Sequence, residues 1–324
     1  MKHIVINGTT GFIGQHLVKL LLSKNFRVTS IVRDKNKVHQ DLINVNHKII
    51  ELGFHEYQNL NNYIDCNFDI FIHLAWSGYG KNTNNVDAQI ENIIPVIKAM
   101  QFSSEKMCKR FIFVSSFSEY MIDENETMQH IEGAASNIYG SVKKATRIIA
   151  HSLSKQLNIE FISVALANTF GPGDISERST NVIIKKLLDE EPVLLTHGNH
   201  LYDWIYINDT VNGIISASLH GKPDEFYYIG DQLRPLKEII REVRDHISPE
   251  VDIILGAYEE KFHVDYSSVD INKLYKHTSF KPKTNFLIAL DETVKWIKQM
   301  NIKEEDKVAG KYVKENSYEN IDGK

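Results

Sequence analysis

Tyr139 and Lys143 are the two side chains of this 324-residue sequence whose types and spacing most clearly suggest chemistry. Tyr139 is the only one of 14 tyrosines that is followed four residues later by a lysine. Residues four apart lie on one face of a helix, so we expect the ammonium to lie near the phenol. A nearby ammonium lowers the pKa of a tyrosine toward the range useful for proton transfer. The pair therefore indicates an acid–base function, although a surface Tyr–Lys pair would show the same spacing.

A glycine-rich run near the N-terminus indicates a dinucleotide site. It reads Gly8-Thr9-Thr10-Gly11-Phe12-Ile13-Gly14 and stands between a strand candidate, His3–Asn7, and an amphipathic helix candidate, Phe12–Lys24. Glycines permit a tight turn and let backbone N–H groups approach a pyrophosphate at the positive end of a helix. Because phosphate-binding loops require this position between a strand and a helix, the run predicts a bound dinucleotide rather than a plain turn.

Both motifs lie in a part of the chain where short β-rich runs alternate with helical stretches. Further strands are expected at Arg27–Val32, Lys48–Leu52, Asp69–Ala75, Arg110–Ser115 and Glu160–Ala167, and further helices at Val86–Phe102 and Ala134–Gln156. Val- and Ile-rich strands that alternate with helices predict a parallel sheet with helices on both faces. The expected fold class is therefore α/β, a Rossmann-type doubly wound parallel sheet.

The spacing becomes less regular after Gly171-Pro172-Gly173, which predicts a second unit. We expect residues 1–170 to form the dinucleotide-binding domain, with some later returns of the chain, and residues 171–300 to form mainly a smaller α/β lobe that binds the substrate. Its expected helices are Asn181–Asp189, Ile207–Leu219, Leu236–His246 and Phe286–Met300, and its short strands are Pro192–Leu195, Phe226–Ile229 and Asp252–Leu255. Residues 301–324 contain 11 charged residues and predict a flexible tail.

Composition and charge disfavour other classes of protein. Thirty-seven basic against 42 acidic residues give a net charge of −5, which leaves no basic excess for a nucleic-acid partner. The apolar runs are far shorter than the ~20 residues of a membrane span, and the expected strand at His3 leaves no room for a signal peptide. With Cys66 and Cys108 as the only cysteines, neither a disulfide scaffold nor a cysteine-based zinc site is expected. The sequence predicts a cytoplasmic enzyme without a metal or a membrane partner.

Several motifs resemble one known family. Gly-Thr-Thr-Gly-Phe-Ile-Gly at 8–14 is similar to the glycine loop of the extended short-chain dehydrogenase/reductases, also called NAD-dependent epimerase/dehydratases. Ile72-His73-Leu74-Ala75 resembles the fourth strand of that family. Asp-Trp-Ile-Tyr-Ile-Asn-Asp at 203–209 resembles a signature of its sugar-nucleotide branch. The resemblance covers roughly residues 3–300 and implies a nicotinamide cofactor and a nucleotide-diphosphate sugar as substrate.

The resemblance also implies roles for individual residues. Tyr139, Lys143 and the strand-end Ser116 would be catalytic, with Ser115 as the alternative if the register is shifted by one residue. His73 would be a packed residue, and Asn92 would brace the fourth strand. Cofactor contacts would come from Gly8, Thr10, Gly11, Phe12, Ile13, Gly14, Arg33, Leu74, Ala75, Tyr139 and Lys143. Substrate contacts would come from Trp76, Ser77, Asn168, Arg178 and Tyr202.

The sequence departs from the family pattern in three features. Phe117 and Ser118 stand where dehydratases of the family have an acidic pair, and neither can exchange protons at neutral pH, so loss of water from the sugar is disfavoured. Tyr202 replaces an arginine that clamps the diphosphate in many relatives, and Arg178, Arg234 or a lysine could take over that contact. The third expected strand also ends without the usual aspartate that contacts the adenine.

Three functions remain open at this point. The first is NADPH-dependent reduction of a keto group, at C4, of a nucleotide-linked deoxy sugar or heptose in bacterial surface-glycan synthesis. It is favoured because the sequence around Gly8, Arg33-Asp34, 171–174 and Trp204 resembles CDP-abequose synthase-type 4-reductases. The second is an NAD-dependent sugar-nucleotide 4-epimerase or C4 dehydrogenase. The third, a non-catalytic NADP-binding sensor, is disfavoured because binding alone needs no proton donor.

Arg33 favours NADP(H) over NAD(H) as the cofactor, although NAD(H) stays possible. The second expected strand ends at Val32, where NAD-binding members place an acidic residue against the ribose. A guanidinium there can instead bind a 2′-phosphate, unless Asp34 turns inward and restores the preference for NAD. Since family members commonly pair two helices, we also expect a homodimer through Val86–Phe102 and Ala134–Gln156.

Overall fold

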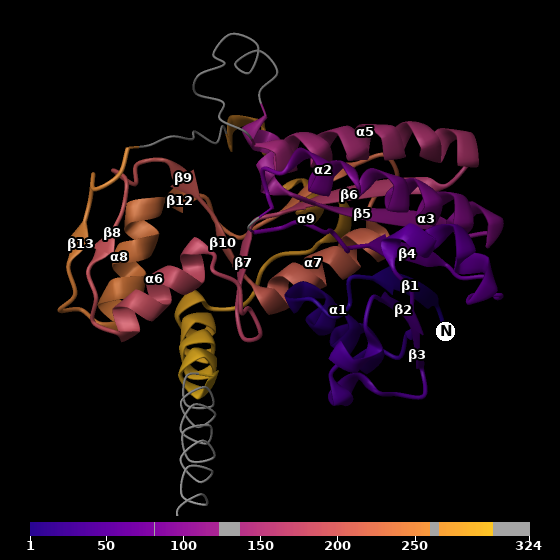
Figure 1. Cartoon of the computed structure of the whole chain (residues 1–324). Coiled ribbons are helices and arrows are strands. Elements are labelled where there is room, and N and C mark those ends of the chain that lie inside the picture. Colours follow the sequence, from indigo (N-terminus) through magenta and orange to yellow (C-terminus); the bar gives the residue numbers. More distant parts are fainter. Residues whose placement is uncertain (81, 123–136, 260–265, 301–324) are drawn as a thin grey trace, which may run out of the picture.

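A seven-stranded parallel sheet forms the centre of the computed structural model, which describes residues 1–80, 82–122, 137–259 and 266–300 (Figure 1). The strand order is β11-β6-β5-β4-β1-β2-β3, and every pairing is parallel. The strands are β1 (His3–Asn7), β2 (Arg27–Val32), β3 (His47–Glu51), β4 (Ile70–His73), β5 (Arg110–Ser116), β6 (Glu160–Leu166) and β11 (Phe226–Ile229). The predicted α/β fold with a parallel doubly wound sheet is confirmed.

Helices cover both faces of this sheet, which explains its continuous apolar runs. Ile4 and Ile6 of β1 pack into one core cluster, and the intervening Val5 packs into the cluster on the other face. Alternate side chains of a strand point to opposite faces, so a strand buried on both faces needs apolar residues throughout. The first face is covered by α1 (Phe12–Ser23) and α7 (Ile207–His220), and the second by α3 (Ile93–Glu105) and α5 (Ile138–Leu157).

The carboxyl ends of β1 and β4 are joined by one buried side chain, that of Asn7. Its Nδ2 atom lies 2.9 Å from Nδ1 of His73, and its Oδ1 atom accepts the N–H groups of Leu74 and Ala75 at 2.8 Å each. His73 is buried, and burial lowers its pKa to about 3, so the ring is neutral. The segment after β4 is therefore held against the glycine loop that follows β1, and His73 serves as a packed residue.

A smaller lobe lies beside the sheet, at the left of Figure 1. Two short strand pairs flank its helices, and a third pair connects it to the sheet domain. The elements of the lobe and its connection are β7 (Asn168–Phe170), α6 (Ser179–Leu188), β8 (Val193–Leu194), β9 (Leu201–Tyr202), β10 (Trp204–Tyr206), β12 (Arg234–Pro235), α8 (Leu236–Ile247) and β13 (Ile253–Ile254). β7 pairs with β10, β8 with β13 and β9 with β12. The chain thus leaves the sheet after β6 and returns to it at β11.

The remaining elements are short helices and the last described helix. The 3₁₀ helices are η1 (Lys35–Lys37), η2 (Gln40–Leu42), η3 (Phe54–Asn62), η4 (Phe117–Met121) and η5 (Tyr266–Ser268). The α-helices are α2 (Val86–Ile90), α9 (Lys273–Thr278) and residues 286–300. None of the helices in the described ranges is long and apolar enough to span a membrane.

The expectation of one helix over Val86–Phe102 is wrong, because α2 ends before α3 begins at Ile93. Pro95 explains the break. In a continuous helix its ring would clash with the carbonyl of Glu91, and it has no N–H to bond that carbonyl. As the third residue of α3, Pro95 is tolerated. The first residues of the helix expected over Ala134–Gln156, and the charged tail at 301–324, lie outside the described residues.

Gly14 is the tightest position of the glycine turn and gives a test of this packing. A Cβ atom there would lie 2.2 Å from the carbonyl oxygen of Gly8, whereas one at Gly11 would lie 3.4 Å from that oxygen. We expect Gly14→Ala to lower the free energy of unfolding of the cofactor-free protein by about 1–3 kcal/mol, as overpacking does. Urea unfolding of both variants tests this, with Gly11→Ala as the matched control that changes little. Equal losses of the free energy of unfolding in the two variants would contradict the expected clash at Gly14.

Candidate active site

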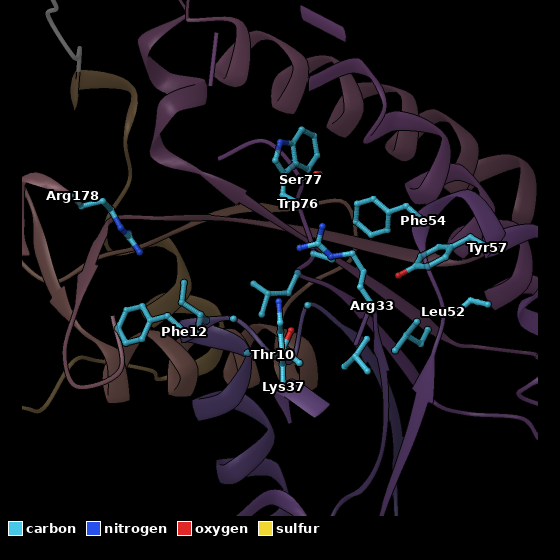
Figure 2. A pocket seen from close by; sticks show the side chains of 18 residues that line it. Thr10, Phe12, Arg33, Lys37, Leu52, Phe54, Tyr57, Trp76, Ser77 and Arg178 are labelled. Carbon is cyan, nitrogen blue, oxygen red and sulfur yellow. The ribbon is translucent and has the colours of Figure 1, made fainter. Parts of the chain in front are cut away.

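A cavity of about 440 Å³ opens over the glycine loop at the carboxyl edge of the sheet (Figure 2). We call it the glycine-loop cavity. Nine of the predicted cofactor residues line it: Gly8, Thr10, Gly11, Phe12, Ile13, Gly14, Arg33, Leu74 and Ala75. Gly8 has a φ of +75°, and a Cβ atom there would lie 2.7 Å from the backbone nitrogen of Ala75. The turn therefore requires glycine at this position.

The beginning of α1 supplies the positive end that a pyrophosphate needs. Gly11 is the N-cap of this 12-residue helix and has no side chain that could bond the first N–H groups. Unpaired N–H groups at a helix N-terminus attract anions. The cavity and the turn therefore fit a dinucleotide cofactor, with its pyrophosphate over the glycine loop.

At one end of the glycine-loop cavity, Arg33 lies beside Phe54 and Tyr57 (Figure 2). Lys37 also lines the cavity, whereas the neighbouring Asp34 does not. The Oδ1 atom of Asp34 instead accepts the N–H of Asn36 at 2.9 Å and caps η1. Lys37, Phe54 and Tyr57 were not predicted from the sequence as residues of this cavity. Only their proximity to the ends of two predicted strands could have indicated them.

A second cavity, of about 160 Å³, brings Ser116, Tyr139 and Lys143 together. We call it the catalytic cavity. Ser116 ends β5 beside Tyr139 and donates its hydroxyl to that of Ser118 at 3.1 Å, while Tyr139 and Lys143 lie one turn apart on α5. The neighbouring Ser115 instead donates its hydroxyl to the buried Glu119. Of the two serines that line this cavity, Ser115 therefore has a buried partner of its own, and the Ser116 hydroxyl lies next to Ser118.

Lys143 is 3% exposed, and its ammonium lies among groups that carry no full charge. Its Nζ atom donates to the carbonyl oxygen of Val114 at 2.9 Å and lies 3.8 Å from the centre of the Trp76 ring. Burial lowers the pKa of Lys143 to about 7, and Glu119 acts weakly in the opposite direction. The side chain therefore changes its protonation state near neutral pH.

The expected lowering of the Tyr139 pKa is wrong for the protein without its ligands. Burial raises that pKa, a nearby tyrosine at position 79 acts in the same direction, and the hydrogen bond with Ser116 only partly offsets them. Desolvation of a phenolate outweighs the attraction that a lysine at i+4 suggests. Tyr139 is therefore neutral at pH 7 and carries the proton that an acid must donate.

A third cavity, of about 760 Å³, lies outside the catalytic cavity and is lined by Tyr79, Ser118, Asn137, Tyr139 and Arg178, among others. We call it the outer cavity. Arg178 lines all three cavities. Its Nε atom donates to the Ser176 hydroxyl at 3.1 Å, and its guanidinium lies 3.4 Å from the Asp174 carboxylate. An anchored guanidinium at this junction can bind an anionic group that reaches toward Tyr139.

Two further predicted substrate residues form a pair beside the catalytic cavity. Tyr202 donates its hydroxyl to Oδ1 of Asn168 at 3.2 Å, and Asn168 lines the catalytic cavity. The buried Nδ2 atom of Asn168 has no partner in the described structure. A buried donor without a partner is costly, so this amide is suited to bind a ligand. Arg234 pairs with Glu242 at 2.6 Å and lines none of the three cavities, in contrast to Arg178.

The segment after β4 carries the last two predicted substrate residues, Trp76 and Ser77. Both line the glycine-loop cavity, and Trp76 also lines the catalytic cavity. Asn92 accepts the N–H of Ser77 at 2.6 Å and donates to its carbonyl at 3.2 Å, so it braces this segment. Phe117 faces the catalytic cavity and Ser118 faces the outer cavity. Neither can act as a carboxylic acid.

In the described ranges, no group of three or more His, Cys, Asp or Glu side chains could hold a metal ion. In the catalytic cavity, Tyr139 carries a proton that it can transfer, and Ser116 and Lys143 line the same cavity. The cavity over the glycine loop adds a place for a redox cofactor next to them.

Comparison with protein families and curated relatives places this geometry in context. The model of the NAD dependent epimerase/dehydratase family matches residues 4–230. A CDP-abequose synthase from Salmonella typhimurium is 25% identical over 307 residues, 91% of this chain and 98% of that protein. A dTDP-4-dehydro-6-deoxyglucose reductase from Escherichia coli is 22% identical over 317 residues, 91% of this chain and 97% of that protein.

Solved structures share the fold across both lobes. The UDP-N-acetylglucosamine 4-epimerase from Methanobrevibacter ruminantium, in complex with UDP-N-acetylmuramic acid, has a TM-score of 0.76 and 21% identity, and covers 92% of this chain and 99% of that chain. The Bordetella bronchiseptica enzyme WbmF, in complex with NADH, has a TM-score of 0.75 and 19% identity, with 96% of each chain covered. At these identities the likeness shows the fold.

The buried ammonium of Lys143 predicts a stability that depends on pH. The folded protein protonates Lys143 below about pH 7, whereas the unfolded chain protonates it below its ordinary pKa of 10.5. Between these values the unfolded state binds more protons, so the wild type gains stability as the pH rises. The Lys143→Met variant has no ionisable group at this position, so its stability does not have this pH dependence. We expect the variant to be more stable than the wild type at pH 6.5, and the difference to shrink toward pH 10.5.

Urea unfolding at several pH values measures this difference. Lys185→Met, at an exposed position of α6, is the control, and its difference from the wild type should not vary with pH. A Lys143→Met difference that stays constant from pH 6.5 to 10 would show that the ammonium is not desolvated.

Proposed function

The chain belongs to the NAD dependent epimerase/dehydratase family, and we propose that it is an NADPH-dependent reductase of a nucleotide-diphosphate-linked keto sugar. The carbonyl group would lie at C4 of a deoxy sugar or heptose. One observation carries the proposal: Ser116, Tyr139 and Lys143 meet beside the glycine-loop cavity, while Phe117 and Ser118 occupy the positions of the dehydratase acidic pair. Among the described residues, the site thus has a proton donor for a ketone, and neither Phe117 nor Ser118 can act as the acid or base that removes water.

The arrangement of the side chains supports a short mechanism. NADPH in the glycine-loop cavity would supply the hydride to the carbonyl carbon of the sugar. The carbonyl oxygen would accept hydrogen bonds from Ser116 and Tyr139, which both line the catalytic cavity. Tyr139 would donate its proton to this oxygen as the alkoxide forms, and the protonated Lys143 would stabilise the phenolate left behind. Solvent then returns the proton to Tyr139.

The nucleotide diphosphate would bind where the cavities meet. Arg178 borders all three cavities, and the unpartnered amide of Asn168 lies at the edge of the catalytic cavity. A guanidinium and an amide N–H₂ are both donors suited to phosphate oxygens. Trp76, Ser77 and Tyr202 complete the proposed substrate contacts. In this assignment, Arg178 binds the diphosphate in place of the arginine that many relatives have where this chain has Tyr202.

A 4-epimerase is the second candidate, because it would use the same serine, tyrosine and lysine. The structural neighbour from M. ruminantium is an epimerase, and WbmF binds NADH. An epimerase returns the hydride to the sugar and consumes no cofactor, whereas a reductase consumes one NADPH per product. Cofactor consumption therefore separates the two functions.

We expect the purified protein with NADPH to add two hydrogen atoms to a nucleotide-linked 4-keto-6-deoxyhexose, as detected by mass spectrometry and by loss of NADPH. Tyr139→Phe should lower kcat by about 10²–10⁴-fold, since it removes the proton donor, and should leave NADPH affinity nearly unchanged. Tyr63→Phe, at an exposed tyrosine, is the control.

Two results would contradict this function. One is a 4-keto-6-deoxy product from an unmodified nucleotide hexose, which would indicate a dehydratase. The other is a C4 epimer formed without net consumption of NADPH. A Tyr139→Phe variant that keeps more than about a tenth of the wild-type kcat would exclude Tyr139 as the acid.

The preference for NADPH is proposed on the surroundings of Arg33. Its side chain lines the glycine-loop cavity together with Lys37, while the Asp34 carboxylate caps η1 and lies outside the lining. Two cations and no carboxylate at this end of the cavity suit a 2′-phosphate. The surroundings therefore support the preference inferred from the sequence.

We expect the wild type to bind NADPH at least roughly tenfold more tightly than NADH, about 1.4 kcal/mol, and Arg33→Ala to remove most of this difference. Dissociation constants for both reduced cofactors measure it. Lys35→Ala is the control, because Lys35 is exposed and does not line the cavity. Equal affinities of the wild type for the two cofactors would overturn the assignment.

A homodimer through α2, α3 and α5 is proposed on an exposed apolar surface. The side chains of Val86, Ile90, Ile94, Ile148 and Ile149 on these helices are 41–59% exposed. Exposed apolar residues that gather on adjacent helices indicate an interface, and a second copy is the occupant the family resemblance implies.

We expect light scattering to show a dimer at micromolar concentration and Ile148→Glu to shift it to monomer, because a carboxylate would be buried at the interface. Ile288→Glu, at a 57% exposed isoleucine of the last described helix, should leave the dimer intact. A wild type that is monomeric throughout this range would refute the interface.

A further inference from the structure

Trp76 lies against the ammonium of Lys143 at the centre of the site. The Nζ atom is 3.8 Å from the centre of the indole ring, compared with 5.1 Å from that of Phe113 and 5.9 Å from that of Tyr139. An ammonium over an aromatic face is attracted by the ring quadrupole, and tryptophan provides the strongest attraction. This attraction is largest where water is excluded, and Lys143 is 3% exposed.

A buried glutamine fixes the orientation of the indole ring. The Nε1–H of Trp76 donates to Oε1 of Gln89 at 2.8 Å. Gln89 is fully buried, and its Nε2 atom donates to the carbonyl oxygens of Gly78 and Asn82 at 2.8 and 2.9 Å. The ring also contacts Tyr139 edge to face, with ring centres 6.1 Å apart and planes at 87°. Trp76 thus touches both residues of the proposed acid–base pair.

In the part of the chain that the structure describes, the titratable groups around Lys143 do not provide a paired counter-charge. Glu119 is the carboxylate that influences Lys143, but it bonds the Ser115 hydroxyl and pairs with Arg147 at 2.7 Å. His73 and Tyr139 are buried and neutral at pH 7. Within the described ranges, the partners of the ammonium are therefore the carbonyl of Val114 and aromatic rings, above all the indole.

We propose that Trp76 is a positioning residue that keeps Lys143 protonated and directed toward Tyr139. Its indole ring compensates the ammonium, which is paired with no carboxylate of the described residues, and Gln89 keeps the ring in place. This role rests on the proposed acid–base function of Tyr139 and Lys143. The proposal gives Trp76 a role toward Lys143 in addition to the substrate contact that was inferred from the sequence.

The proposal is tested by the pH dependence of cofactor binding and of turnover in Trp76→Phe and Trp76→Leu. Lys143 is one of the expected cofactor contacts and is proposed to assist Tyr139, so both NADPH affinity and kcat/KM should fall as the pH rises and Lys143 deprotonates. Loss of the indole favours the neutral amine. We expect the pH midpoint of this fall to move lower by roughly one unit in Trp76→Leu and by less in Trp76→Phe, which keeps an aromatic face.

Tyr275→Leu is the matched control, since it removes a different lysine–aromatic contact, that of Lys281 at 4.2 Å, on the surface. Its pH profile should equal that of the wild type. A folded Trp76→Leu variant with lower activity but an unmoved midpoint would overturn the proposal and leave Trp76 a packing residue. If Trp76→Leu does not fold, an unmoved midpoint in Trp76→Phe overturns the proposal in the same way, and a lower midpoint supports it.

NADPH binding separates this inference from the proposed reaction. If no keto sugar is reduced but the binding midpoint still moves in Trp76→Leu, the reductase function fails and the role of Trp76 stands. If reduction is observed and neither midpoint moves, the role of Trp76 fails and the reductase function stands. NADH replaces NADPH as the probe if the protein binds it more tightly.

Discussion

Parallel pairing of the strands is the constraint on which the rest of this structure depends. It places the carboxyl ends of β1, β2, β4, β5 and β6 at one edge, so the segments that follow them must share that edge. The amide of Asn7 fixes the spacing between two of these ends. The bond from Lys143 to the carbonyl of Val114 fixes α5 against a third. The glycine loop, Ser116 and Tyr139 meet because of this arrangement.

Burial, rather than the attraction between neighbouring charges, controls the protonation states at this edge. Lys143, Tyr139 and His73 are all shifted toward their neutral forms, because each would have to lose its hydration to become charged. A site built from neutral groups can hold a proton donor next to a potential cation without the cost of desolvating a permanent ion pair. Arg178 supplies positive charge at the junction of the cavities, where it keeps partial access to water.

Much of this arrangement could be predicted from the sequence, because it depends on local patterns. The alternation of apolar runs located all six strands of the first half, and the Tyr–Lys spacing and glycine loop located the two sides of the site. The break at Pro95 was missed, since apolar periodicity continues across it. Lys37, Phe54 and Tyr57 were missed because only the folding of η1 and η3 brings them to the cavity. The direction of the Tyr139 pKa shift depends on how deeply the side chain is buried, and the Tyr–Lys spacing of four residues gives no information about burial.

The return of the chain at β11 means that the two lobes are not independent segments. β6 forms its outer pairing with Phe226–Ile229, which follow the first part of the smaller lobe, β7 to β10, in the sequence. A fragment that ends near residue 170 would therefore expose the unpaired edge of a buried, apolar strand, which is a template for aggregation. During synthesis on the ribosome, the same edge stays open until residue 229 has emerged. The sheet can consequently be completed only after the first part of the smaller lobe, from β7 to β10, has been made.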